Sequence, residues 1–142
     1  MREILYRGKC IKYDDMYGCV DDDMYGWAQG YYVCLEEIWK KRKTHRIYNG
    51  LAEFDCGEFY ADYYEVDPET VSQFAGLLDK NGNRIYEGDI ILYRENNIGV
   101  VDFADGAFGV RFNNGTSAMF LCFAADYSVV IGNIYDNPEL LG

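Results

Sequence analysis

The stretch FAGLLDKNGNRIYEGDII, from Phe74 to Ile91, decides the fold of this 142-residue chain. Two short apolar runs flank its polar centre, and Asn81-Gly82 is the pair that best tolerates positive φ at both central positions of a type I′ turn. We therefore predict a β-hairpin here. The glycine of Glu87-Gly88-Asp89 lets the backbone kink before a further strand begins at Ile90. These polar residues are typical of turns rather than of a catalytic site.

Beyond this stretch, strand and turn signals recur about every ten residues. The predicted strands are 99–103, 108–112, 118–123 and 128–135. Asp105-Gly106 separates the first two, and the run at 118–123 is fully apolar, which favours a buried strand. This pattern predicts a small, strongly bent β-barrel of the Src-homology-3-like kind for residues 67–142.

The first half of the chain predicts a second subdomain, residues 1–66, that is β-rich or α+β. Segment 51–66 favours a tyrosine-rich hairpin. Segment 34–41 fits either a short helix with one apolar face or an edge hairpin with a basic turn, and the sequence leaves both open. Asp67-Pro68-Glu69 matches an N-cap, a proline at the first helical position and an early acid, so one helical turn is predicted through Gln73.

Composition argues against several kinds of site. The formal net charge is −11, which repels duplex nucleic acid unless positive charge is concentrated somewhere. The five cysteines are Cys10, Cys19, Cys34, Cys56 and Cys122. They form no C-x-x-C pair and accompany one histidine, so we expect reduced, buried thiols in a cytoplasm, with no disulfide framework, metal or cofactor. The longest apolar run, 118–125, is too short for a membrane span of about 20 residues.

Basic and aromatic residues interleave in one stretch. This candidate interaction surface consists of Trp39, Lys40, Lys41, Arg42, Lys43, His45, Arg46 and Tyr48. Three interpretations remain open: a solvated loop, a cationic surface that neutralises acids of a neighbouring subunit, and a nucleic-acid patch. A lone histidine without a sequence partner predicts no catalytic role for His45.

Two further motifs carry a family resemblance. DPETVSQ at 67–73 precedes the opening stretch, and VIGNIYDNPELL at 130–141 lies near the end. With the opening stretch, they resemble the YopX family of phage and prophage proteins, although Ala75 stands where many relatives have Thr. The structural motif residues are Asn81, Gly82, Glu87, Gly88, Asp89, Gly132 and Asn133. The resemblance implies a mostly β architecture, a bacterial cytoplasm or prophage origin, no established biochemical function and no catalytic residues to transfer.

No sequence motif indicates an enzyme: the chain has no P-loop, G-x-S-x-G or H-E-x-x-H. We therefore predict a non-catalytic phage or prophage accessory protein that self-associates and contacts a host or phage protein. Nucleic-acid binding through residues 40–46 is one alternative. An acidic surface that mimics DNA is another, since the net charge permits it.

Overall fold

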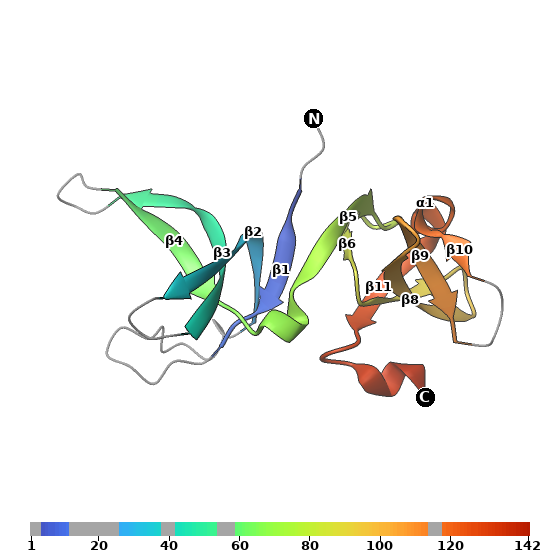
Figure 1. The fold of residues 1–142 in the computed structure, drawn as a ribbon. Coiled ribbons are helices and arrows are strands. Elements are labelled where there is room, and N and C mark those ends of the chain that lie inside the picture. Colours follow the sequence, from blue (N-terminus) through green and yellow to red (C-terminus); the bar gives the residue numbers. More distant parts are fainter. Residues whose placement is uncertain (1–3, 12–25, 38–41, 54–58, 114–117) are drawn as a thin grey trace. The chain divides into compact units, whose positions relative to one another are not determined.

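The structure is a computed structural model that describes residues 4–11, 26–37, 42–53, 59–113 and 118–142. Strands dominate these segments (Figure 1), so the prediction of a mainly β protein is confirmed. The chain divides into two compact units, which we call the N-terminal unit, Ile4–Ser72, and the C-terminal unit, Gln73–Gly142. The division follows Ser72, whereas the sequence motif placed a boundary after Val66.

In the described residues of the N-terminal unit, four antiparallel strands pair in the order β4-β3-β2-β1. They are β1 (Tyr6–Lys9), β2 (Trp27–Glu37), β3 (Arg42–Glu53) and β4 (Phe59–Glu65). The pairing of β2 with β3 decides the ambiguous segment 34–41 for a hairpin over its described residues. One face of the sheet carries a small core of Ala28, Ile47 and Val66, against which tyrosines pack. The tyrosine-rich sequence thus supplies packing where aliphatic residues are scarce.

A short 3-10 helix, η2 (Pro68–Thr70), ends the N-terminal unit. The Asp67 side chain accepts a hydrogen bond from the Glu69 N–H at 3.0 Å, so the predicted cap is confirmed. The turn is shorter than predicted because the Thr70 hydroxyl donates to the Asp67 carbonyl and accepts from the Lys9 N–H at 2.8 Å. These bonds fasten η2 to β1, and Ser72 already belongs to the next strand.

The C-terminal unit contains a hairpin of β5 (Ser72–Leu78) and β6 (Arg84–Tyr86), and an antiparallel sheet in the order β10-β9-β8-β7-β11. The sheet strands are β7 (Asp89–Tyr93), β8 (Asn97–Ala104), β9 (Ala107–Phe112), β10 (Met119–Phe120) and β11 (Ser128–Asn133). A 3-10 turn, η4 (Pro138–Leu141), follows. Among the described residues the sheet is open, with β10 and β11 at its two edges, and the predicted small barrel of the Src-homology-3-like kind is not confirmed.

The turn predicted as type I′ has a different geometry. Gly82 has φ 84°, but Asn81 is not at positive φ. The Gly82 N–H donates to the Asp79 carbonyl at 3.0 Å, which leaves one left-handed residue after an ordinary turn. A primed turn occurs instead in the β8–β9 hairpin, where Asp105 and Gly106 have φ 53° and 79°, although it was not predicted there. The hairpin at Asn81-Gly82 is confirmed, and its turn type was predicted wrongly.

The apolar run 118–123 is also not a continuous strand. After Phe120 the chain forms α1 (Leu121–Ala124) and the 3-10 turn η3 (Ala125–Tyr127). Leu121, Ala124 and Ala125 are buried together in the core of the C-terminal unit. Their spacing is helical, and a short apolar run does not distinguish a strand from a buried helix. The helical turn places three residues in the core that a strand would have divided between two faces.

Candidate interaction surfaces

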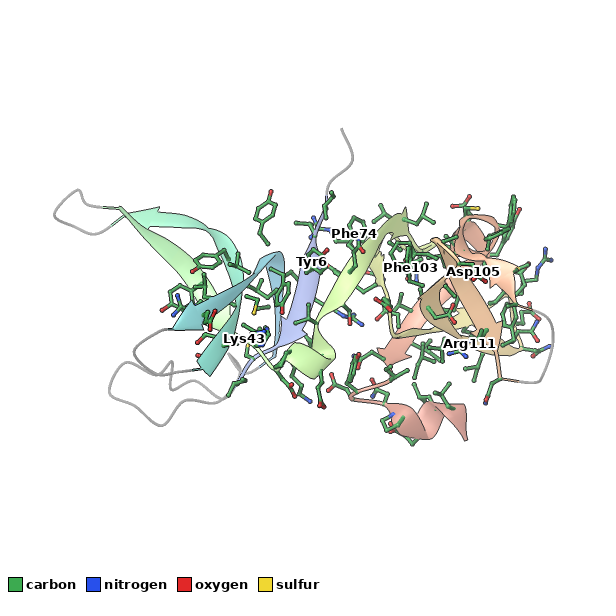
Figure 2. The ribbon with its side chains drawn as sticks, viewed as in Figure 1. Tyr6, Lys43, Phe74, Phe103, Asp105 and Arg111 are labelled. Atoms are coloured by element: carbon green, nitrogen blue, oxygen red, sulfur yellow. The ribbon has the colours of Figure 1, made fainter. Side chains whose placement is uncertain are left out.

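The basic stretch falls on the β2–β3 hairpin. Trp39, Lys40 and Lys41 lie outside the described residues, and Arg42 begins β3. Figure 2 labels Lys43, whose side chain is exposed on β3. His45, Arg46 and Tyr48 follow and are half-buried.

Strand register places carboxylates opposite these cations. Lys43 stands directly across from Glu36 on β2. Arg46 stands across from Glu65 on β4, and burial raises the pKa of Glu65. Opposed residues of antiparallel strands share a face with Cβ atoms about 5 Å apart, so unlike charges attract. Of the described cations, Lys43 and Arg46 are therefore each opposed by a carboxylate within their own sheet.

Alternation along β3 sends the remaining candidate residues to opposite faces. The Arg46 guanidinium carbon lies 4.3 Å from the centroid of the Tyr63 ring, and its Nη1 donates to the Tyr48 hydroxyl at 3.2 Å. On the other face, His45 stacks on Tyr32 with centroids 5.9 Å apart, and its Nδ1 is 2.5 Å from the Tyr32 hydroxyl. Burial, with a smaller effect of a nearby cysteine, raises the pKa of Tyr32. The described part of the candidate interaction surface therefore divides into two aromatic clusters, one on each face of the sheet.

The cysteines differ from the sequence expectation. Cys34 and Cys122 are exposed, so the prediction of buried thiols is wrong for both, while Cys19 and Cys56 lie outside the described residues. Cys34 stands opposite His45 in the register, a neighbour that the sequence did not indicate. Within the described ranges no hydrogen bond joins this thiol to the imidazole, and no group of three or more His, Cys, Asp or Glu could hold a metal ion.

Asn81 and Gly82 form the β5–β6 turn, and the other structural motif residues lie at the junction of β7 and β11. Gly88 has φ 85°, its N–H donates to the Val101 carbonyl at 2.8 Å, and its carbonyl accepts from the Ile134 N–H at 2.9 Å. Asp89 pairs with Asn133 in the register, and the Asp89 carboxylate accepts from the Tyr86 N–H at 2.8 Å. The kink predicted at Glu87-Gly88-Asp89 is therefore present, and these residues fix the path of the backbone.

The segment after Gly132 closes this junction with side chains. The Asn133 Oδ1 accepts from the N–H groups of Tyr135 and Asp136 at 3.0 and 2.9 Å. The Asn137 Oδ1 accepts from the Asn133 N–H at 3.2 Å. Gly132 leaves room for Asn137, because a Cβ there would lie 2.6 Å from that Oδ1. The geometry of this turn therefore accounts for the glycine at position 132 and for the asparagines at positions 133 and 137.

Asp79 holds the opening stretch in place, and the sequence analysis did not single it out. Its side chain is 5% exposed. Oδ1 accepts from the N–H groups of Asn81 and Asn83, each at 2.9 Å, and Oδ2 accepts from the Val130 N–H at 3.0 Å. Desolvation by burial is the largest single effect and raises the pKa of Asp79, but these hydrogen bonds together outweigh it and lower the pKa.

A second feature missed by the sequence analysis is an aromatic stripe, which we define as Phe120, Phe123 and Tyr127. Their exposed fractions are 55, 66 and 54%. They recur at i, i+3 and i+7: Phe120 ends β10, Phe123 lies in α1 and Tyr127 ends η3, whereas Leu121, Ala124 and Ala125 between them enter the core. The Phe120 and Phe123 rings lie 6.3 Å apart. This spacing was a detectable signal, but it was masked by interpreting the apolar run as a strand.

An open cavity of about 580 Å³ adjoins the end of the stripe at Tyr127. It is lined by Lys80, Arg94, Glu95, Asn96, Asn97, Asp126 and Tyr127. The Arg94 Nε donates to the Tyr93 hydroxyl at 3.1 Å. This bond and the two neighbouring tyrosines raise the pKa of Arg94. The C-terminal unit therefore presents apolar and charged groups side by side on one surface.

In the part of the chain that the structure describes, no helix has the length and apolar content to cross a bilayer. Residues 25–142 match the model of a protein family described as YopX protein. The crystal structure of protein EF1440 from Enterococcus faecalis is similar, with a TM-score of 0.59, 23% sequence identity and 100% of each chain covered. At that identity the likeness concerns the fold alone. No curated protein matches the chain.

Proposed function

The chain belongs to the YopX family, as its motifs indicated, and because that membership names no activity, we propose from the surface of the C-terminal unit that it is a non-catalytic protein-interaction module that self-associates. One observation carries the proposal. The segment from Phe120 to Tyr127 presents apolar side chains on both of its faces, one in the core and one in solvent.

Exposed aromatic clusters are typical of protein contact sites. Aromatic residues are enriched at interfaces because each ring removes a large apolar area from water with few side-chain torsions to order. Phe123 and Tyr127 of the aromatic stripe sit on a helical segment that is anchored by buried Leu121 and by the Ser128 hydroxyl, which donates to the Ala124 carbonyl at 2.7 Å. A rigid base of this kind reduces the entropy lost on association.

A second copy of the chain is the occupant that we propose for the stripe. Twofold association lets the same patch meet itself, so one exposed aromatic surface suffices for a closed dimer. The cations Arg94 and Lys80 beside the stripe suit a partner with a net charge of −11. The same module would serve a phage or prophage accessory protein in a bacterial cytoplasm, and the genes that neighbour its own would test that setting.

Light scattering after size-exclusion chromatography tests self-association. We expect wild type to be dimeric or larger and Phe123→Ser to be shifted toward monomer. Loss of a central interface aromatic costs about 2 kcal/mol, which is about 30-fold in Kd. Leu78→Ser is the matched control, because Leu78 is also an exposed apolar residue of this unit but lies outside the stripe. A wild-type monomer at every concentration would refute self-association, and an unchanged Phe123→Ser oligomer would refute the role of the stripe.

Nucleic-acid binding through the basic stretch receives less support, because Glu36 and Glu65 oppose its described cations. Fluorescence anisotropy with single-stranded and duplex DNA at low salt distinguishes the two proposals. Our proposal predicts no binding by wild type. Salt-sensitive binding that is weakened by Lys43→Glu would instead support the nucleic-acid alternative.

A further inference from the structure

The cavity beside the aromatic stripe is built from three parts of the C-terminal unit that are distant in sequence. Lys80 comes from the β5–β6 turn, Arg94 from the β7–β8 turn, and Tyr127 from η3. Backbone hydrogen bonds fix these parts to each other. The Lys80 N–H donates to the Ser128 carbonyl at 3.0 Å, and the Arg94 N–H donates to the Tyr127 carbonyl at 2.8 Å. Both cations therefore project from anchored positions.

Arg94 has an unusual backbone conformation for its residue type. Its φ is 57°, in the left-handed region that glycine and asparagine adopt more easily. The residue is exposed, so core packing does not account for an arginine here. A conformation of this kind motivates a functional hypothesis, which the contacts of the side chain must then support.

The guanidinium of Arg94 is held in a defined orientation. Its central carbon lies 5.4 Å from the Tyr93 ring centroid and 5.1 Å from that of Tyr127. Because Nε donates to the Tyr93 hydroxyl, the two Nη groups remain for another acceptor. In the described ranges neither Arg94 nor Lys80 forms an ion pair. A planar fork of donors held in this way matches the two oxygens of a carboxylate.

The charges around the cavity favour a ligand with one negative charge over a ligand with two. Lys80 and Arg94 are balanced by Glu95 and Asp126 in the lining. A phosphate dianion entering this site would meet two carboxylates as well as two cations, whereas a carboxylate would bring only a single negative charge and so less repulsion. The adjoining aromatic stripe would accept an apolar residue next to that carboxylate.

We propose that Arg94 and Lys80 bind the carboxylate of an acidic residue in a partner polypeptide whose neighbouring apolar residue lies on the aromatic stripe. This inference rests on the proposed interaction function and names the chemistry that the surface recognises. Arg94, in the β7–β8 turn, supplies the bidentate contact, and Lys80, in the β5–β6 turn, supplies a second positive charge. The stripe supplies apolar contact area that does not discriminate between acidic and neutral peptides.

Titration of the full chain followed by NMR at the Arg94 Nε–Hε resonance tests the proposal. The probes are N-acetyl-Phe-Glu-amide, its neutral counterpart N-acetyl-Phe-Gln-amide, and inorganic phosphate, all at one ionic strength. We expect the Glu probe to bind about tenfold more tightly than the Gln probe, because charge-assisted hydrogen bonds distinguish them. Equal binding of the two peptides, or tighter binding of phosphate than of the Glu probe, would overturn the carboxylate assignment.

Two variants test whether the preference for the Glu probe arises at the cavity. Arg94→Asn should abolish the preference for the Glu probe while keeping the fold, since asparagine tolerates positive φ, and Lys80→Gln should reduce the preference by a smaller factor. For these variants binding is followed at the backbone amide of Tyr127. Arg111→Asn is the matched control, because Arg111 is a surface arginine of the same unit whose Nε contacts Asp102 at 2.7 Å on β8. Figure 2 labels Arg111. A preference that survives Arg94→Asn would refute the site.

This outcome is separable from the test of self-association. A chain that is monomeric yet prefers the Glu probe would refute dimer formation and leave the carboxylate site intact. A chain that forms dimers through Phe123 yet does not discriminate between the probes would refute the carboxylate site alone.

Discussion

Replacement of Asp79 by asparagine should destabilise the C-terminal unit, because one carboxylate joins the β5–β6 turn to β11. Three backbone N–H groups, from Asn81, Asn83 and Val130, donate to its two oxygens at 2.9, 2.9 and 3.0 Å. Asparagine keeps one oxygen, which still serves the turn. Its amide nitrogen would then face the Val130 N–H, so two donors meet at a position that is 5% exposed.

The magnitude follows from these contacts. A buried N–H that loses its acceptor costs about 1–3 kcal/mol, and the two remaining bonds weaken because they no longer end on a charge. We expect Asp79→Asn to lower the free energy of unfolding by about 2–4 kcal/mol at pH 7. That is a large part of the stability of a small domain, which is about 5–15 kcal/mol.

The effect should depend on pH with a definite sign. The folded-state pKa of Asp79 is lowered, so its stabilising contribution is present above the unfolded value of about 3.8. It is lost as the pH falls through the lower, folded-state pKa. The stability difference between wild type and Asp79→Asn should therefore be largest near neutrality and shrink in acid.

Urea unfolding followed by far-ultraviolet circular dichroism, at pH 7 and in acid, measures this difference. Hydrogen exchange at the Val130 amide reports the lost bond directly and should become faster in the variant. Asp105→Asn is the matched control, because Asp105 is an exposed turn residue with φ 53°, which asparagine tolerates (Figure 2). A loss below about 0.5 kcal/mol for Asp79→Asn, or equal losses for both variants, would refute the reasoning.

Two other substitutions test the turn motif and the N-terminal unit. Gly132→Ala should destabilise by about 1–3 kcal/mol in urea unfolding, since its Cβ would lie 2.6 Å from the Asn137 Oδ1, whereas Gly26→Ala, with no atom near the added Cβ, should be nearly neutral. Tyr32→Phe should cost about 1 kcal/mol through its lost hydrogen bond to His45. Because burial raises the pKa of Tyr32, alkaline absorbance titration of wild type should show a late phenol titration that this variant lacks. Wild-type stability should fall as the pH rises from about 10 through that raised value. Equal effects at the two glycines, or an unchanged titration, would contradict these predictions.

The local features of the fold were predictable because adjacent residues determine them. Asp67-Pro68 caps a helical turn through its own side chain and ring, and the glycine in Glu87-Gly88-Asp89 permits the positive φ of a kink. Apolar residues at every second position of segment 108–112 identified a strand, which the structure has as part of β9. The glycine- and asparagine-rich motifs also identified the YopX family.

The candidate surfaces were less predictable because they depend on which strands become neighbours. Lys43 and Arg46 stand out as a positive cluster along the chain, but Glu36 and Glu65 arrive opposite them only through strand pairing. Similarly, the apolar residues around Leu121 satisfy both a strand and a helix pattern. The space available over the core of the C-terminal unit decides between them.

By itself, the sequence determined where the chain turns, because backbone conformation at glycine, proline and capping aspartate responds to covalent and near-neighbour forces. Only the tertiary structure brought Asp79 to Val130, across 51 residues, and Arg94 to Lys80 and Tyr127 around one cavity. Contacts between such distant residues follow from strand order and from the packing of one shared core, and no short segment contains that information.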